Sequence, residues 1–313
     1  MTILITGAEG FVGRNLVQEL LLKDYSLLYP TRAELNLVDE LMVKEYFKNH
    51  EITHIIHAAT TLRDGTSYPP DTCENNLRMF FNLQKFKHPG AILINLGSGS
   101  EYSRSHWHRK MSEDFFDEQI PQDPHSYAKY LISKYILEKE DDTLVSLRIF
   151  GVYGKYEDYR YKFISNAIVK NILHLPIVIN QNVIYDYLCV SDLGRIVEYF
   201  IKNRSNHRVL NATPVNSIDL IRIANIINQI SNYKSEIHVL NDGVGIEYSG
   251  DNSRLMSEIG DFKFTDEVIS INSLREYYLE TQESLDFSAI EADDYLSYAK
   301  DLRQKYFGKN NDK

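Results

Sequence analysis

Three glycines near the start of the chain constrain its fold more than any other feature. Gly7, Gly10 and Gly13 lie in GAEGFVG, directly after an apolar run (2–6) and at the start of a segment with apolar residues at helical spacing (11–23). One glycine permits a tight turn, another lets backbone N–H groups approach a pyrophosphate, and the third allows close packing of helix on sheet. The order strand, glycine turn, helix predicts a dinucleotide-binding unit. The alternative is a glycine-rich turn that binds nothing.

The first half of the chain extends this unit into a larger fold. Short β-branched runs alternate with longer segments of helical periodicity, which implies right-handed crossovers and a parallel sheet covered on both faces. We therefore expect an α/β protein with a Rossmann-type, doubly wound parallel sheet and a smaller C-terminal substrate lobe. The predicted strands are 2–6, 26–29, 53–58, 91–96 and 144–149, and the predicted helices are 11–23, 39–49, 72–87 and 126–139.

The pattern is less regular in the second half. We expect residues 1–155 to form the cofactor-binding domain, completed by elements near 183–212, and residues 156–313 to form mainly the substrate lobe. The predicted elements here are helix 160–173, strands within 177–190, helix 192–203 and closing helices 272–280 and 289–306.

Composition excludes several classes of protein. The 44 acidic and 34 basic side chains give a net charge of −10, which argues against binding to nucleic acid or anionic membranes. Cys73 and Cys189 cannot build a disulfide framework. No apolar run approaches the roughly 18 residues that span a bilayer, and MTILITG does not resemble a signal peptide. We expect a cytoplasmic protein.

The end of the second predicted strand indicates which cofactor fits. An Asp or Glu there would bind the ribose hydroxyls of NAD, whereas this chain reads Tyr29-Pro30-Thr31-Arg32. The guanidinium of Arg32 suits a 2′-phosphate, so we expect NADP, with NAD as the alternative. The alternative stays open because Arg32 is also typical of a solvated loop charge, and because the Glu9 carboxylate would repel a 2′-phosphate.

A tyrosine and a lysine four residues apart form the candidate catalytic pair. Tyr130 and Lys134 lie in the predicted helix 126–139, so they share one face with Cβ atoms about 6 Å apart. An ammonium group at that place lowers the pKa of the phenol and prepares it for proton transfer. Tyr127 is a rival, but Leu131 stands four residues after it in place of a lysine.

A serine follows the fourth predicted strand. The strand 91–96 runs into GSGSEY (97–102), and ligands collect at the carboxyl edge of parallel sheets. We expect Ser98 to donate a hydrogen bond to a substrate oxygen. The ten histidines, among them His54, His57, His106 and His108, lack an HExxH motif or a ligand set with carboxylates, so we expect no metal site.

Ordered motifs over about residues 1–275 resemble the extended short-chain dehydrogenase/reductases of the NAD-dependent epimerase/dehydratase family, which modify nucleotide sugars. The TRAELNLVD stretch at 31–39 is especially similar to the branch of 4-keto reductases that includes GDP-L-fucose synthases. The matching motifs are TGAEGFVG (6–13), HAA (57–59), Asn76, GSGSEY (97–102), YLISK with Glu138, LRIFGVYG (147–154), YDYLCVSDL (185–193) and DNSRL (251–255).

The resemblance implies a role for each matching residue. Ser98 corresponds to the catalytic Ser/Thr, Tyr130 to the general acid/base and Lys134 to the lysine that binds the nicotinamide ribose. The cofactor-binding residues that it implies are Gly7, Gly10, Phe11, Val12, Gly13, Arg32, Asp39, Ala58, Ala59, Tyr130 and Lys134, and the substrate-binding residues are Ser100, Lys162, Asp186 and Arg254.

The resemblance also implies an activity. We expect NADPH-dependent reduction of a 4-keto (6-deoxy) sugar nucleotide at C4, in the synthesis of surface polysaccharide. A 4-epimerase or 4,6-dehydratase with tightly held NAD is the alternative enzyme, and a non-catalytic NADP-sensing protein is the alternative of another class. Ser100 stands where members that also invert neighbouring carbons have a cysteine, and Lys162 stands near their histidine, so we expect no inversion at C3 or C5.

Three further features differ in how well they fit the family. Tyr185 replaces the arginine that normally precedes Asp186 and contacts the diphosphate; Arg254 is the remaining candidate for that contact, with a salt bridge at a helix start as the alternative. In the family, two long helices pair with those of a partner, which implies a homodimer through a four-helix bundle. The segment after about residue 281 matches no pattern of the family.

Overall fold

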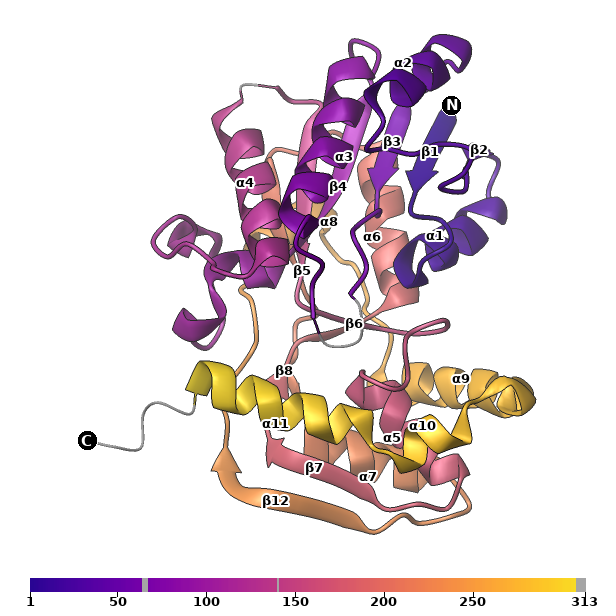
Figure 1. Cartoon of the computed structure of the whole chain (residues 1–313), viewed down its shortest axis with the longest axis vertical. Helices are drawn as coiled ribbons and strands as arrows, with labels where there is room; N and C mark the ends of the chain where they lie inside the picture. The colour runs from indigo at the N-terminus through magenta and orange to yellow at the C-terminus, as the bar shows by residue number, and fades with distance from the viewer. Residues whose placement is uncertain (64–66, 140, 308–313) are drawn as a thin grey trace.

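The computed structural model describes residues 1–63, 67–139 and 141–307, with side chains as far as residue 304. Within these residues, six strands form one parallel sheet in the order β10-β5-β4-β3-β1-β2, so their carboxyl ends lie at one edge (Figure 1). The strands are β1 (Thr2–Thr6), β2 (Ser26–Leu28), β3 (His54–His57), β4 (Ile92–Ser98), β5 (Leu144–Ile149) and β10 (Val209–Ala212).

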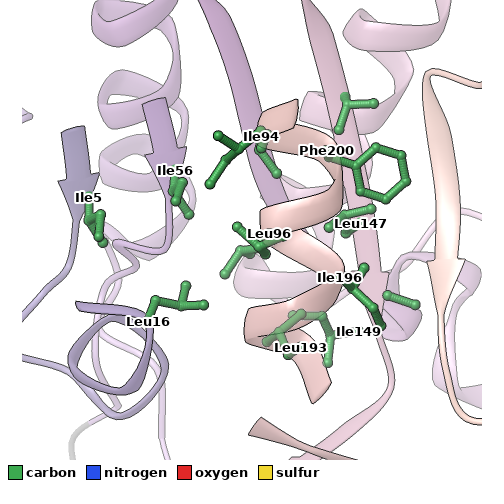
Figure 2. Close-up of a cluster of buried hydrophobic side chains, with 14 of the residues drawn as sticks. Ile5, Leu16, Ile56, Ile94, Leu96, Leu147, Ile149, Leu193, Ile196 and Phe200 are labelled. Carbon is green, nitrogen blue, oxygen red and sulfur yellow. The ribbon is translucent and has the colours of Figure 1, made fainter. Parts of the chain in front are cut away.

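Helices cover both faces of this sheet. On one face, α1 and α6 pack against the strands; on the other, α2, α3 and α4 do so. Figure 2 shows the first of these cores, in which Leu16 of α1 and Phe200 of α6 meet strand residues such as Ile5 and Leu147. The helices are α1 (Phe11–Leu21), α2 (Glu40–Asn49), α3 (Thr72–Phe86), α4 (Pro124–Glu138) and α6 (Val190–Lys202).

A smaller lobe lies beyond the carboxyl edge of the sheet (Figure 1). Its core is formed by α5, α7 and α9 against the parallel pair β7 and β12. The elements of the second half and of the connecting loops are η1 (Gly99–Tyr102), η2 (Arg104–His106), η3 (Glu113–Phe115), β6 (Gly151–Tyr153), α5 (Phe163–Ile172), β7 (Ile177–Asn182), β8 (Ile184–Tyr185), β9 (Tyr187–Cys189), β11 (Ile218–Asp219), α7 (Leu220–Ile230), β12 (Ile237–Val244), α8 (Ser253–Ile259), α9 (Glu267–Glu280), η4 (Gln282–Ser284), α10 (Phe287–Glu291) and α11 (Asp294–Phe307).

The predicted fold class is confirmed, and most boundaries in the first half lie within two residues of the prediction. The starts of helices differ where capping was overlooked. α4 begins at Pro124 because the Asp123 carboxylate accepts the Ser126 N–H, and α9 begins at Glu267 because Asp266 caps it in the same way. The predicted closing helix 289–306 is two helices, α10 and α11. Among the described residues, no helix is long and apolar enough to cross a bilayer.

Candidate active site

A cavity of about 610 Å³ lies between the carboxyl edge of the sheet and the small lobe. Ser98, at the end of β4, reaches it from the sheet side. Aromatic rings from distant parts of the chain form much of its wall, and four cationic side chains, Arg63, Arg104, Lys162 and Arg303, also line it. The aromatic residues are Tyr68, Trp107, Phe150, Tyr161, Phe163, Tyr185, Tyr187, Tyr248, Tyr295 and Tyr298.

The glycine loop at the same edge of the sheet is shaped by close backbone contacts. Gly7 has a φ of +69°, and a Cβ there would lie 2.7 Å from the Ala59 backbone. A Cβ on Gly13 would lie 2.1 Å from the Gly7 carbonyl oxygen. The predicted cofactor residues Ala58 and Ala59 therefore form the floor of the loop, and the glycines at positions 7 and 13 are required by the fold itself.

The N-terminus of α1 fits a negatively charged group. Gly10 is the N-cap residue, no side chain caps it, and the first turn carries no acidic residue. The N–H groups of Phe11, Val12 and Gly13 belong to the first turn, whose amides lack helical partners and carry the positive end of the helix dipole. Together with the cradle formed by Gly7, this arrangement fits the pyrophosphate of a dinucleotide.

Arg32 and Glu9 lie close together where we expect the adenosine part of the cofactor. Arg32 is exposed just after β2, and its backbone N–H donates to the Glu9 carboxylate at 3.1 Å. Among the described residues, the guanidinium of Arg32 has no ion pair. Asp39, a predicted cofactor residue, instead accepts the N–H groups of Leu41 and Met42 at 2.9 and 3.1 Å as the N-cap of α2.

Ser98 is held in position by its neighbours. Its N–H donates to Glu101 Oε1 at 2.8 Å, and its Oγ lies 2.9 Å from Ser100 Oγ. Glu101 is fully buried and forms an ion pair with Arg148 Nε at 2.6 Å. Ser100 also lines the cavity. Two predicted residues, Ser98 and Ser100, therefore lie together at the sheet edge with hydroxyls facing a common space.

The predicted pair Tyr130 and Lys134 does not join them. The hydroxyl of Tyr130 donates to the Asp117 carboxylate, and Lys134 Nζ donates to the same carboxylate at 2.8 Å. Burial and the hydrogen bond to Asp117 raise the pKa of Tyr130, which is opposite to activation. Within the described residues, the cavity lining includes neither side chain. The structure therefore does not bring Tyr130 and Lys134 together with Ser98, because the two side chains lie on a different face of α4, where both bind Asp117.

A histidine and a lysine, also four residues apart, occupy the face of α4 that meets β4. His125 lines the cavity, and Lys129 is buried with its Nζ donating to the Leu96 carbonyl at 2.7 Å. Leu96 precedes Ser98 by two residues in β4. The sequence contained a signal for this pair: Ala128, Ile132 and Ile136 mark the buried face of α4, and positions 125 and 129 fall on it.

Two of the predicted substrate residues have structural roles instead. Asp186 is fully buried and saturated: it accepts from Lys110 Nζ at 3.1 Å, Ser217 Oγ at 2.6 Å and Gly250 N at 2.9 Å. Arg254 forms an ion pair with Asp114, with Glu113 3.9 Å away. Neither contributes to the cavity lining in the described part of the chain, so both assignments are corrected.

Lys162 does line the cavity, beside an unusual carboxyl group. Glu157 is buried in the same wall and accepts the Ser165 hydroxyl at 2.6 Å. Burial raises the pKa of Glu157 to about 7, although Lys162 acts in the opposite direction. No cluster of three potential metal ligands occurs among the residues that the structure describes.

The outermost wall comes from α11, which lies in the segment that matches no pattern of the family. This helix lies beside β7 of the lobe (Figure 1) and also contacts η2 of the cofactor-binding half. Its Tyr298 hydroxyl accepts Arg63 Nη1 at 2.5 Å, while Tyr68 accepts Arg63 Nη2 at 2.7 Å. A tyrosine repeat at helical spacing (295, 298) was the available signal, but the target of its packing was not readable from the sequence.

A model of the NAD dependent epimerase/dehydratase family matches residues 3–212, which include all of the six-strand sheet except Thr2. In sequence, the chain is similar to GDP-L-colitose synthase of Yersinia pseudotuberculosis, with 24% identity over 303 residues that cover 89% of this chain and 98% of the relative.

Solved structures share the fold. GDP-mannoheptose C4 reductase from Campylobacter jejuni, with NADP bound, has a TM-score of 0.74 and 18% identity, and covers 89% of this chain and 98% of its own. UDP-glucose 4-epimerase from Thermotoga maritima has a TM-score of 0.75 and 18% identity, and covers 90% of this chain and 100% of its own. At these identities the likeness shows a common fold.

Proposed function

Because the chain belongs to the NAD dependent epimerase/dehydratase family, we propose that it is a nucleotide-sugar oxidoreductase. It reduces a 4-keto (6-deoxy) sugar nucleotide at C4 with NADPH, NADH being the alternative reductant, in the synthesis of a surface polysaccharide. The observation that carries this proposal is the cavity at the carboxyl end of β4, with Ser98 at its edge. The relatives that are named for GDP-sugar synthesis and C4 reduction support the choice of reaction.

The glycine loop serves the cofactor and the cavity serves the sugar nucleotide. When bound, NADPH supplies a hydride to the carbonyl carbon of the sugar. The loop of Gly7, Gly10 and Gly13 and the N–H groups of the first turn of α1 hold its pyrophosphate, and Arg32 holds the 2′-phosphate. Ser98 donates a hydrogen bond to the sugar oxygen on which negative charge develops.

The substrate's diphosphate faces the cationic wall. In place of Arg254, which is engaged with acidic residues, Arg104 and Lys162 provide positive charge in the cavity. The small lobe, mainly residues 156–313, thereby serves as the substrate lobe. Its aromatic rings suit the base and the sugar faces.

A substrate screen tests this function. Purified protein and NADPH are incubated with GDP-, UDP-, dTDP- and ADP-linked 4-keto sugars, and products are read by mass spectrometry. We expect one nucleotide class to gain two mass units as its ketone becomes an alcohol, with matching NADPH consumption. Consumption of no 4-keto sugar nucleotide would refute the proposal.

The similarity to a UDP-glucose 4-epimerase structure makes a 4-epimerase or a 4,6-dehydratase the second candidate. Such enzymes retain their cofactor between turnovers, whereas a reductase exchanges it. The absorbance of the purified protein near 340 nm, before and after borohydride, separates the two. Protein that carries no cofactor after purification favours the reductase, and a borohydride-generated band at 340 nm favours the second candidate.

Reduction without inversion at neighbouring carbons follows from the residues at the sheet edge. Ser100 carries a hydroxyl in place of a thiol, and a hydroxyl is a poor acid or base at neutral pH. Turnover in D₂O should leave C3 and C5 of the product free of deuterium beyond the enzyme-free background. Enzyme-dependent deuterium at either carbon would contradict this.

The outer faces of α3 and α4 suit a homodimer. The two helices pack together, and Phe81, Tyr127 and Leu137 are each 38% exposed on them. A four-helix bundle with the same pair of a second copy would cover these side chains. Light scattering of the purified protein tests the dimer, and fractionation of the producing cell tests its location in the cytoplasm.

A further inference from the structure

Helix α4 carries two pairs of an acid/base side chain and a lysine at a spacing of four, and only one pair faces the cavity. With about 100° of rotation per residue, positions 125 and 129 differ by about 40°, while position 130 lies about 140° from position 125. His125 and Lys129 therefore share the face that meets β4, and Tyr130 points away from it. The contacts agree, since Lys129 binds the Leu96 carbonyl and Tyr130 binds Asp117.

Lys129 is a buried cation at the edge where the cofactor would end. Its Nζ donates to the Leu96 carbonyl at 2.7 Å, and its side chain is enclosed by the protein. Burial lowers the pKa of Lys129 to about 8, with Glu101 acting in the opposite direction. A positive charge so placed stabilises negative charge that develops in the adjacent cavity.

The hydrogen bonds around His125 define its tautomer. The Asn76 Oδ1 accepts the Thr61 N–H at 2.8 Å, which fixes it as the amide oxygen. The Thr60 hydroxyl donates to this oxygen at 3.3 Å, so its only hydrogen is committed. We assign His125 Nδ1, which lies 3.4 Å from the same hydroxyl, as the nitrogen that donates. Among the residues that the structure describes, none forms a hydrogen bond with His125 Nε2, so this atom is available to a ligand.

The ring of His125 is held flat and at the cavity. It stacks on Tyr68 with centroids 5.1 Å apart and an angle of 1° between the planes. His125, Tyr68 and Ser98 all line the same cavity. A side chain with a stacked ring and an Nε2 atom available in the same cavity as a serine hydroxyl is arranged to exchange a proton with a bound oxygen.

We propose that His125, through Nε2, is the proton donor to the sugar oxygen at C4, with Lys129 beneath it and Ser98 beside it. This inference rests on the proposed function. In the reduction, hydride adds to the carbonyl carbon, and the carbon–oxygen π pair moves to oxygen. That oxygen takes the proton from Nε2–H of the imidazolium. The neutral ring that remains is the Nδ1–H form already bound to Thr60, and water returns the proton for the next turnover.

The surroundings of His125 give the reaction a distinctive pH dependence. Burial and then Lys129 lower the pKa of His125 to about 3 in the free protein; Arg63 and Arg104 act in the same direction, and Asp123 opposes them. The imidazolium is thus a minor form at pH 7. Because kcat/KM reports the free enzyme, it should fall about tenfold per pH unit as pH rises. A phenol donor, with its pKa above 10, would give no such fall below pH 9.

Substitutions test the assignment. His125→Gln should lower kcat/KM by about 100-fold or more and leave NADPH binding by calorimetry intact. The matched control His238→Gln, on an exposed part of β12, should retain wild-type activity. His125→Tyr places a phenol above Lys129, and should recover part of the lost rate while abolishing the fall of kcat/KM with pH. Comparison with Tyr130→Phe shows which face of α4 carries the donor.

A second readout does not depend on turnover. In protein with ¹⁵N-labelled histidine, the signals that disappear in His125→Gln should be those of an Nδ1–H tautomer that stays neutral down to about pH 5. An Nε2–H tautomer, or titration near pH 6.5, would overturn the proposal. So would more than a tenth of wild-type kcat/KM in His125→Gln, or a loss caused by Tyr130→Phe alone. Turnover that survives His125→Gln refutes His125 only, whereas absence of turnover in the wild type refutes the proposed function as well.

Discussion

The two parts of the proposed site, the glycine loop on the cofactor side and the cavity on the sugar side, are built differently. On the cofactor side, backbone atoms shape the site, and Gly7 and Gly13 are packed too closely to accept a Cβ. On the sugar side, large side chains shape the site, with aromatic rings and guanidinium groups from widely separated segments of the chain. Backbone recognition suits a ligand that is constant, and side-chain recognition can change without disturbing the fold. The difference indicates that substitutions on the two sides should have separable effects.

The largest effect is expected on the cofactor side, from Gly13→Ala. The new Cβ would lie 2.1 Å from the Gly7 oxygen, and neither backbone segment can move away without disrupting the loop. We expect loss of measurable NADPH binding and a free energy of unfolding lower by about 3 kcal/mol. The control is Gly194→Ala in α6, where the atom nearest to the Cβ belongs to the flexible Glu19 side chain, at 3.3 Å. Calorimetry measures NADPH binding, and urea unfolding measures the free energy of unfolding. Unchanged NADPH binding in Gly13→Ala would contradict the role of the backbone in holding the cofactor.

The next largest effect concerns the choice of cofactor. Arg32→Ser should lower the affinity for NADPH about 10- to 100-fold and leave that for NADH unchanged, because a charge-assisted contact to the 2′-phosphate is lost. Lys44→Ser removes the same charge from exposed α2 and serves as the control. Equal affinities of the wild-type protein for the two cofactors would mean that the neighbouring Glu9 cancels Arg32.

A smaller effect is expected from the sugar side. Tyr298→Phe removes the hydroxyl that accepts Arg63 Nη1 and leaves the ring in place. We expect KM for the sugar nucleotide to rise about tenfold, since one buried charged hydrogen bond is lost, with no change in NADPH affinity. Tyr233→Phe, whose hydroxyl binds the remote His174 carbonyl, is the control. A change in NADPH affinity with Tyr298→Phe would show that the two sides are coupled.

A further expected effect is a contrast in the pH dependence of stability. On the sugar side, burial raises the pKa of Glu157 to about 7, so its contribution is present below pH 4.5 and is lost as pH rises through 7. On the cofactor side, burial and then Lys129 lower the pKa of His57 to about 3, so its contribution is present above pH 6.5 and is lost as pH falls. Glu157→Gln should therefore reduce the loss of unfolding free energy between pH 5 and 8 by about 2 kcal/mol. Urea unfolding at both values measures it, and equal losses in variant and wild type would contradict the assignment.

The cofactor side could be predicted from the sequence because its signals are local. A glycine loop, apolar strands and helix periodicity lie within short stretches, and each dictates its own structure. The boundaries missed by the prediction depend on caps such as Asp123 and Asp266. The sugar side could not be predicted, because contacts such as that of Arg63 with Tyr298 join residues 235 positions apart.

The catalytic helix shows how a correct motif can lead to the wrong residue. Tyr130 and Lys134 satisfy the expected spacing, but spacing alone does not say which face of α4 is buried. The positions of Ala128, Ile132 and Ile136 carry that information, and they place Lys129 against β4. Asp186 and Arg254 lie in motifs that match the family. Their ion-pair partners, Lys110 and Asp114, come from a loop that is distant in the sequence. The sequence did not show these pairings.

The position of α11 has a consequence for the order in which the two binding sites form during synthesis. The parallel sheet is complete once β10 (209–212) has left the ribosome, and domains fold as units from the N-terminal side during translation. The wall that holds Tyr298 against Arg63 is translated after every segment that it contacts. The nascent chain can therefore acquire its dinucleotide before it can enclose a sugar, and the cavity closes last.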